Sequence, residues 1–304
     1  MKKILIALIV VFLIISCGKT ESGPTSIEPP AVPTLDSLFF GTDSTFEIVT
    51  WNIQNFPKMS STTANYVVQV IMTIDADVFA LQEIESSSYF DYVISQLNEQ
   101  DSLYIWDGYR AIGASYDVNL AYIYKSGFIQ LNDIYGIFED DWFAFPRSPL
   151  VFELTYEDED LVIINNHLKA GGGTGDEERR QDASLKLQAF VDSTFSETEV
   201  IIIGDLNDDI TEPQATNVFW NFISQPESYL FADMEIAEGP FANWSYPSWP
   251  SHLDHILITN ELFDEYENST VQTILVDHYL EGGWHEYDEN ISDHRPVGMK
   301  FAFE

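Results

Sequence analysis

The stretch VIIIGDLN, residues 200–207, joins an apolar β-branched run to a carboxylate and an amide. Four consecutive Val and Ile residues predict a buried β-strand, because branched side chains pack well on a pleated sheet. Gly204 then leads to Asp205 and Asn207, two polar side chains at the point where the strand ends. Standing alone, such a pair is explained by an ordinary turn after a strand. Whether it marks a site depends on its recurrence elsewhere in the chain.

Six further polar side chains stand directly before or after apolar, strand-like runs. They are Asn52, Glu83, His167, Asp254, Asp293 and His294. In a sandwich of sheets, strand ends converge at an edge and present their side chains to one cleft. Carboxylate and amide oxygens suit Mg²⁺, Mn²⁺ or Ca²⁺, and imidazoles transfer protons near neutral pH. The set predicts a site for a hard cation and a phosphate, whereas one cysteine and the spacing of the His residues do not fit a structural zinc.

The remaining periodicity predicts strands mixed with helices. Apolar runs of strand length lie at residues 46–51, 78–81, 120–124, 150–154, 161–165, 255–258 and 297–303. Helical spacing of apolar residues is found at 64–74, 89–97 and 177–195, the last being the longest. This mixture predicts an α/β sandwich, although periodicity alone does not give the order of the layers.

The charge of the chain is strongly unbalanced. There are 13 Lys and Arg against 50 Asp and Glu, for a formal net charge of -37, while 45% of the 304 residues are hydrophobic and can fill a large core. Proteins bind nucleic-acid backbones largely through Lys and Arg, so this acidity disfavours a polyanion. A bound divalent cation can reverse the field locally, so a phosphate substrate stays open. The acidity also suits an ion-rich external medium.

The N-terminus has the organisation of a secretory signal. Lys2 and Lys3 precede an unbroken apolar run over residues 4–15, which is too short to span a bilayer comfortably. The segment ending in Cys17, IISC, resembles a bacterial lipobox. We therefore expect residues 1–17 to be a lipoprotein signal with Cys17 lipidated, and an extracytoplasmic protein anchored to a bacterial membrane. A plain secretory signal and a cytosolic protein with an apolar N-terminus are the alternatives.

The rest of the chain consists of two parts, a tether and a globular domain. Residues 18–45 are rich in Pro, Ser, Thr and Glu and predict a flexible tether with little to bury. Residues 46–304 then form the expected globular domain, without a second linker or a repeat.

Six short motifs together resemble the endonuclease/exonuclease/phosphatase superfamily, the group of pancreatic-type deoxyribonuclease and the bacterial exonucleases. In chain order they are WNIQN (51–55), LQE (81–83), NHLK (166–169), GDLN (204–207), LDHI (253–256) and SDHRPV (292–297). Each is weak by itself, but all six occur in the family's order and adjoin predicted strands over residues 46–303. The resemblance implies a four-layer αββα sandwich, in which two packed mixed β-sheets are flanked by helices and the site lies at one edge.

The resemblance also implies metal ligands. Glu83 resembles the principal ligand, with Asn52 beside it and Asp293 contributing directly or through water. The expected ion is Mg²⁺, with Mn²⁺ or Ca²⁺ as alternatives, and the sequence does not decide between one ion and two.

Five residues correspond to the family's catalytic groups. Asp205 resembles the group that orients or deprotonates the attacking water, and Asn207 the amide that positions Asp205 or the scissile phosphate. His294 resembles a second imidazole, with Asp254 fixing its tautomer and raising its basicity. His167 is expected to bind a non-bridging phosphate oxygen. The sequence leaves open whether Asp205 or His294 is the base.

Other features carry weaker expectations. Arg147 and Lys169 are candidate substrate contacts, for which a plain salt bridge is an almost equal alternative. The glycine-rich loop at 171–176 is either a phosphate-cradling lid or a flexible connector, and Arg179 and Arg180, which follow it, invite a substrate or salt-bridge role. Four aromatic residues within 241–249 either stack on a substrate or pack on the core.

Together these features predict a metal-dependent phosphodiester hydrolase that is monomeric and lipid-anchored. An endonuclease-like activity on extracytoplasmic DNA or RNA is the leading expectation. The alternatives are a phosphatase or a phospholipase- or sphingomyelinase-like hydrolase of small or lipid phosphoesters, and a non-catalytic member that binds a partner at the membrane surface.

Overall fold

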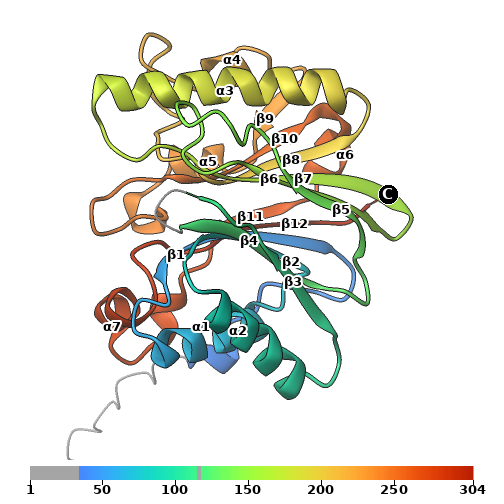
Figure 1. Ribbon diagram of the computed structural model, residues 1–304, viewed down its shortest axis with the longest axis vertical. Helices are drawn as coiled ribbons and strands as arrows, with labels where there is room; N and C mark the ends of the chain where they lie inside the picture. Colours follow the sequence, from blue (N-terminus) through green and yellow to red (C-terminus); the bar gives the residue numbers. More distant parts are fainter. Residues whose placement is uncertain (1–33, 115–117, 304) are drawn as a thin grey trace, which may run out of the picture. The chain divides into compact units, whose positions relative to one another are not determined.

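Two six-stranded mixed sheets carry most of the apolar runs (Figure 1). The computed structural model describes residues 34–114 and 118–303, all within the unit Val32–Glu304. Sheet A has the order β11-β12-β1-β2-β4-β3, and sheet B the order β5-β6-β7-β8-β10-β9. The strands of sheet A are β1 (Phe46–Phe56), β2 (Val78–Ile84), β3 (Trp106–Arg110), β4 (Asn119–Lys125), β11 (Thr270–Thr273) and β12 (Val297–Phe301). Those of sheet B are β5 (Gln130–Gly136), β6 (Leu150–Tyr156), β7 (Glu159–His167), β8 (Glu199–Asp205), β9 (Tyr229–Phe231) and β10 (Asp254–Thr259).

Helices cover the outer face of each sheet (Figure 1). Sheet A is covered by α1 (Ser61–Ile74), α2 (Ser87–Gln100) and α7 (Gly283–Asn290), and sheet B by α3 (Thr174–Thr194) and α4 (Trp220–Ile223). The short helices are α5 (Met234–Ala237), α6 (Phe263–Tyr266) and the 3₁₀ turns Leu35–Ser37, Phe241–Asn243, Asn260–Leu262 and Val276–Tyr279. The four-layer αββα sandwich expected from the sequence is confirmed.

Alternation along β8 shows how the sequence builds these layers. Ile201 and Ile203 belong to the core between the two sheets, whereas Val200 and Ile202 belong to the core under α3. Successive side chains of a strand point to opposite faces, so a strand buried on both faces needs an uninterrupted apolar run.

Helix α3 buries a face that its apolar residues alone did not predict. Leu185, one of the apolar residues behind the prediction, is 51% exposed. The buried face instead combines Ala183, Leu187 and Val191 with the polar residues Arg180, Ser184 and Gln188. The helix also begins earlier than expected, at Thr174, so half of the predicted glycine loop lies in its first turn.

The boundary of the predicted tether is wrong at its C-terminal end. Leu38 and Phe40 are buried in the core beneath α1, and a Cβ atom on Gly41 would lie 2.0 Å from the carbonyl oxygen of Asp75. The chain is therefore packed from about residue 38. The predicted signal, with Cys17, and the tether up to residue 33 lie outside the described residues. Among the described helices, none is both long and apolar enough to cross a bilayer.

Strand lengths also differ from the prediction where polar residues continue a strand. β1 extends through Phe56, so Asn52 lies within the strand and not after it. β3, β5, β9 and β11 were not expected, because edge positions leave sequences such as QLNDIYG in β5 without a continuous apolar run.

Candidate active site

The ends of three neighbouring strands of sheet B bring together the first group of polar residues. His167 is the last residue of β7, Asp205 the last of β8, and Asp254 the first of β10. In the strand register, Asp205 is the partner of both His167 and Asp254. The three side chains that the sequence placed at separate strand ends thus lie in one row.

Gly204 is required by the approach of β7. Its φ of +141° is a conformation that other residues rarely adopt, and a Cβ atom there would lie 2.0 Å from the carbonyl oxygen of Asn166. Glycine at this position lets β8 bring Asp205 against the end of β7.

Sheet A supplies the second group. Asn52 lies in β1 and Glu83 near the end of the parallel strand β2, while Asp293 and His294 precede β12, the other neighbour of β1. Glu83 has a φ of 62°, a left-handed conformation that is strained for a side chain of this size. Its carboxylate accepts a hydrogen bond from the backbone N–H of Asn55 at 2.8 Å.

Asp205 is the buried centre of the combined group. Its Oδ2 accepts a hydrogen bond from Asn52 Nδ2 at 2.9 Å, and its Oδ1 accepts one from the backbone N–H of Asn207 at 3.1 Å. Burial raises the pKa of Asp205 to about 7, although nearby His294 opposes the shift. A carboxyl group with this pKa can accept a proton near neutral pH.

Asn207 is held at the start of the loop after β8. It has a φ of 57°, which Asn tolerates better than most residues, and its Nδ2 donates to the carbonyl oxygen of Leu168 at 3.3 Å. This hydrogen bond ties the loop after β8 to the end of β7.

His294 and Asp254 form a buried imidazole–carboxylate pair. His294 Nδ1 lies 2.7 Å from Asp254 Oδ2, and its Nε2 lies 3.9 Å from Asp205 Oδ2. Burial disfavours the imidazolium, but the carboxylates of Asp254 and Asp205 outweigh it and raise the pKa of His294 to about 10. His294 therefore carries a proton on Nε2, the nitrogen nearest Asp205.

His167 has the opposite electrostatic environment. Its Nε2 lies 3.5 Å from Asp205 Oδ2 and 3.8 Å from Glu83 Oε1. Complete burial, with Arg147 and His294 nearby, lowers the pKa of His167 well below its usual value. The two imidazoles beside Asp205 thus differ in charge, because only one has a carboxylate bonded to its far nitrogen.

The two expected substrate contacts lie differently from the central group. Arg147 donates to the carbonyl oxygen of Leu168 at 3.4 Å, and its Nε is buried without a hydrogen-bond partner. Arg147 lines a neighbouring hollow with Ile112 and Trp142, and not the main cleft. Lys169 pairs with Asp176 at 2.9 Å and is likewise not among the residues that line the cleft.

Three further residues support the group, and only Tyr246 had been noted from the sequence, as one of the four aromatic residues within 241–249. Ser292 Oγ donates to the carbonyl oxygen of Asn52 at 2.6 Å and accepts from the backbone N–H of His294 at 3.0 Å. Gln54 Nε2 donates to Asp293 Oδ2 at 2.8 Å, and the Tyr246 ring lies 4.7 Å from the His294 ring. Gln54 and Ser292 lie within two of the six family motifs, and Tyr246 lies within 241–249; these positions are all that pointed to them in the sequence.

A cleft of about 730 Å³ opens over this group. Glu83, His167, Asp205, Asn207, Asp293 and His294 all contribute to its lining. The lining also includes the carboxylates of Glu177, Asp208, Asp209 and Glu212 and the aromatic rings of Trp244, Tyr246 and Trp249. The candidate site is therefore accessible, acidic and partly aromatic.

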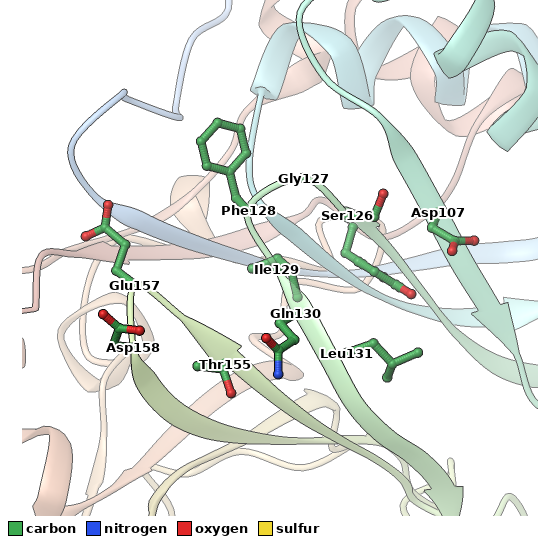
Figure 2. Close-up of a pocket in the computed structure, with 11 residues that line it drawn as sticks. Asp107, Ser126, Gly127, Phe128, Ile129, Gln130, Leu131, Thr155, Glu157 and Asp158 are labelled. Atoms are coloured by element: carbon green, nitrogen blue, oxygen red, sulfur yellow. The ribbon is translucent and has the colours of Figure 1, made fainter.

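A second hollow, of about 570 Å³, lies at the start of β7 and so at the other end of the strand that carries His167. Figure 2 shows Glu157 and Asp158 on one side of it and Asp107 on the other, with Phe128 at the top of the view. Its lining within the described chain contains no imidazole. The acid and imidazole groups expected from the sequence thus gather at one edge of the sandwich only.

The sequence model of the Endonuclease/Exonuclease/phosphatase family matches residues 49–294. The chain belongs to the endonuclease/exonuclease/phosphatase family. Members of this family are generally phosphoester hydrolases and usually use a divalent metal ion. Comparison with curated proteins finds no match.

Solved structures with a similar fold come from the same family. TDP2 of D. rerio in complex with a single-strand DNA product is 15% identical, with a TM-score of 0.64 over 86% of this chain and 100% of that one. The human Nocturnin catalytic domain with bound sulfate is 17% identical, with a TM-score of 0.62 over 90% and 100%. An endonuclease/exonuclease/phosphatase from Bacteroides vulgatus is 14% identical, with a TM-score of 0.61 over 86% and 100%. At these identities the likeness establishes the fold.

The expected metal ligands fit a divalent ion of the kind this family uses. Asn52 Oδ1 is buried without a hydrogen-bond partner in the described chain, whereas the Nδ2 of the same amide donates to Glu83 and Asp205. An unpartnered buried oxygen is costly unless a cation or water occupies its lone pairs. The expected ligands Asn52, Glu83 and Asp293 supply oxygen donors only, the donor type that suits Mg²⁺ or Mn²⁺.

Proposed function

We propose that the chain is a divalent-metal-dependent phosphodiester hydrolase. The observation that carries this proposal is the environment of Asp205. A single buried carboxylate accepts hydrogen bonds from Asn52 and Asn207 and lies within 3.9 Å of one nitrogen of each of His167 and His294. Such a group can activate a water molecule and stabilise charge on a phosphate in one place.

In this proposal the two titratable groups have separate tasks. Asp205, whose pKa is raised to about 7, orients the attacking water and accepts its proton. His294, protonated through its pairing with Asp254, donates from Nε2 to the oxygen that gains charge as the ester bond breaks. Environments that push two pKa values apart are the usual basis for such a division. His167 and Asn207 bind phosphate oxygens from the same side of the cleft.

Glu83, Asn52 and Asp293 would hold the metal ion. When bound, the ion neutralises developing negative charge on the phosphate and polarises the oxygens that it contacts. Gln54 donates a hydrogen bond to Asp293 and so fixes the orientation of that carboxylate.

The walls of the cleft favour a small or lipid phosphodiester over a nucleic acid. Among the lining residues of the described chain, Arg180 is the one Lys or Arg, and it is paired with Asp208. The carboxylates of Glu177, Asp209 and Glu212 have no cationic partner in the described chain, and they would repel a second phosphate. Trp244, Tyr246 and Trp249 offer an apolar surface to the organic part of a substrate. Nucleic acid is the second candidate, supported by the single-strand DNA product bound to the similar TDP2.

A substrate panel at one Mg²⁺ concentration separates the two candidates. Plasmid DNA, RNA, sphingomyelin, bis-(p-nitrophenyl) phosphate and p-nitrophenyl phosphate are compared by kcat/KM. We expect the small or lipid diesters to be the best substrates. A preference for DNA or RNA over every small diester would overturn this choice while leaving the hydrolase proposal in place.

Metal binding by the proposed ligands is tested without activity. Isothermal titration of Mn²⁺ should give one binding event that is weakened by Glu83→Gln. The exposed carboxylate variant Glu178→Gln is the matched control and should bind as the wild type does. If Glu83→Gln and the wild type bind Mn²⁺ with equal affinity, Glu83 is not a metal ligand.

We also propose that the protein is a lipid-anchored, extracytoplasmic monomer. The lipobox-like segment ending in Cys17 supports the anchor, and the net charge of -37 supports an ion-rich medium. Metabolic labelling with a radioactive fatty acid should depend on Cys17, and label that persists in Cys17→Ser would refute the anchor.

A further inference from the structure

A largely buried chain of hydrogen-bonded charged residues adjoins the cleft and contributes Asp208 and Arg180 to its lining. We call it the Asp233–Arg180 chain: Asp233, His255, Asp208 and Arg180. Asp233, His255 and Arg180 are at most 2% exposed, and Arg180 belongs to the buried face of α3, the long helix over sheet B (Figure 1). Among these four residues, Arg180 was singled out from the sequence as one of two basic residues for which a substrate contact or a salt bridge was expected, and the structure gives it a salt bridge to Asp208.

The hydrogen bonds of the chain fix the protonation of its histidines. His255 Nδ1 lies 2.6 Å from Asp233 Oδ2, and its Nε2 lies 2.9 Å from the carbonyl oxygen of Asp208. Both neighbours can only accept, so both ring nitrogens of His255 carry a proton and the ring is an imidazolium. The raised pKa of His255 agrees, since Asp233 outweighs the effect of burial.

His252 completes the group as a neutral ring. Its Nδ1 accepts from the backbone N–H of Ser245 at 3.3 Å, so its proton lies on Nε2, which donates to Asp233 Oδ2 at 2.9 Å. Asp233, His252 and His255 are close enough together to hold a metal ion, but the nitrogens that face Asp233 are both protonated. The group is therefore a hydrogen-bonded ion pair and not a second metal centre.

Arg180 continues the chain on the other side of Asp208. Its Nε donates to Asp208 Oδ2 at 2.7 Å, and its Nη1 donates to the carbonyl oxygens of Lys169 and Gly171 at 2.6 and 2.8 Å. One guanidinium thus joins α3 to the loop after β7 and to the loop after β8. Its planar set of donors suits three fixed acceptors, which a Lys ammonium on a flexible stem does not satisfy as well.

Asp208 is consequently fixed at two points, its carbonyl oxygen by His255 and its carboxylate by Arg180. It follows Asn207, whose side chain donates to Leu168, in the segment that Arg180 holds at Lys169 and Gly171. The chain therefore controls the position of the two loops that flank Asp205.

We propose that Arg180 and His255 are positioning residues for the reaction, acting through Asp208 to hold Asn207 and the end of β7 against Asp205. Arg180 also lines the cleft, but its Nε and Nη1 donate to protein oxygens, which assigns it to holding loops. This inference rests on the proposed hydrolase function.

Arg180→Met tests the proposal, with Arg179→Met as the matched control. Arg179 is the preceding residue of α3 and donates to the carbonyl oxygens of Trp142 and Phe143, away from the proposed site. With bis-(p-nitrophenyl) phosphate and Mg²⁺, we expect Arg180→Met to lower kcat about tenfold to a hundredfold with little change in KM, the scale expected for misplaced catalytic groups. Arg179→Met should remain within about twofold of the wild type.

Two further measurements separate positioning from a loss of folding. Guanidinium chloride at millimolar concentration should restore part of the kcat of Arg180→Ala, because the free ion can replace the lost group. In a double-mutant cycle, Arg180→Met and Asp208→Asn should be non-additive in kcat. If Arg180→Met does not fold, Arg180→Lys, which keeps the charge, carries the same comparison.

The proposal is overturned if folded Arg180→Met or Arg180→Lys has a wild-type kcat, or if Arg179→Met loses as much. A wild-type protein without turnover would instead overturn the proposed function, so the two failures are distinguishable.

Discussion

Two consecutive residues of β10 each belong to a buried imidazole–carboxylate pair, and the two pairs have different environments. Asp254 and His255 are consecutive residues of β10, and alternation along the strand sends them to opposite faces. Asp254 points to the face of Ile256, between the sheets, and binds His294. His255 points to the face of Leu257, under the helices, and binds Asp233.

The far nitrogen of each ring makes the difference. His294 Nε2 lies beside Asp205 at the cleft, 3.9 Å away, whereas His255 Nε2 is bonded to a backbone carbonyl at 2.9 Å. The same two residue types therefore give a group that can transfer a proton in one case and a fixed ion pair in the other. A pairing of His and Asp is not by itself a sign of catalysis; the second nitrogen decides.

The largest predicted effect is on the cleft-facing pair. His294→Ala should lower kcat on a model diester about 10²–10⁴-fold, because it removes the proton donor. Thermal unfolding should change little by comparison. His285→Ala is the control, since its side chain is 88% exposed on α7. Near-normal turnover by His294→Ala would refute the role given to this ring.

Asp233→Asn tests the buried Asp233–His255 pair through the stability of the fold. It leaves the His255 imidazolium buried without its counter-charge, at a cost of about 3–5 kcal/mol in the free energy of unfolding. Urea unfolding of this variant is compared with that of Asp140→Asn, an exposed carboxylate. A loss below about 1 kcal/mol would contradict the ion pair.

The pH dependence of that stability follows from the two pKa shifts. The pKa of Asp233 is lowered because its histidines outweigh burial, so its contribution is lost as the pH falls below about 4. The pKa of His255 is raised by Asp233, so its contribution is lost as the pH rises above about 6.5. The difference between wild type and Asp233→Asn should therefore be greatest between these values.

Asp254→Asn removes the carboxylate from the pair that faces the cleft. Because Asp254 orients His294, the variant should lose activity by about tenfold to a hundredfold, the usual cost of removing the partner of a functional imidazole. The NMR titration of His294 should move to lower pH, since Asp254 is the main group that raises its pKa. An unchanged titration would show that another group sets the charge of this ring.

The smallest predicted effect concerns Glu47, a buried carboxylate that is not paired with an imidazole. Burial and Asp77 raise the pKa of Glu47 to about 8, so the folded state keeps a proton that the unfolded chain releases above about pH 4.5. Stability should therefore fall as the pH rises from about 4.5 to about 8. Glu47→Gln should be more stable than wild type at pH 8 and equal to it near pH 4. Equal stability at both pH values would show that Glu47 is charged when folded.

The central site could be predicted from sequence because of where its residues stand. Asp205, His167 and Glu83 interrupt apolar runs at or near strand ends, and polar side chains there are costly unless they have a task. The four layers followed from the same runs together with the family's motifs.

The supporting residues could not be predicted in this way. Arg180 is separated from Asp208 by 28 positions in the chain and lies on a helix whose buried face is partly polar, so apolar periodicity does not mark it. The contacts of Lys169 and Arg147 likewise depend on the packing of loops, so their residue types alone could not separate a substrate contact from a salt bridge.

The most direct test of the metal-dependent hydrolase proposal is the initial rate of bis-(p-nitrophenyl) phosphate hydrolysis by the wild-type domain during removal and return of metal. We expect turnover with Mg²⁺ or Mn²⁺, its loss after EDTA treatment, and its recovery when the metal is added back. A rate that is unaffected by EDTA, or no turnover of any phosphodiester with any divalent metal, would contradict it.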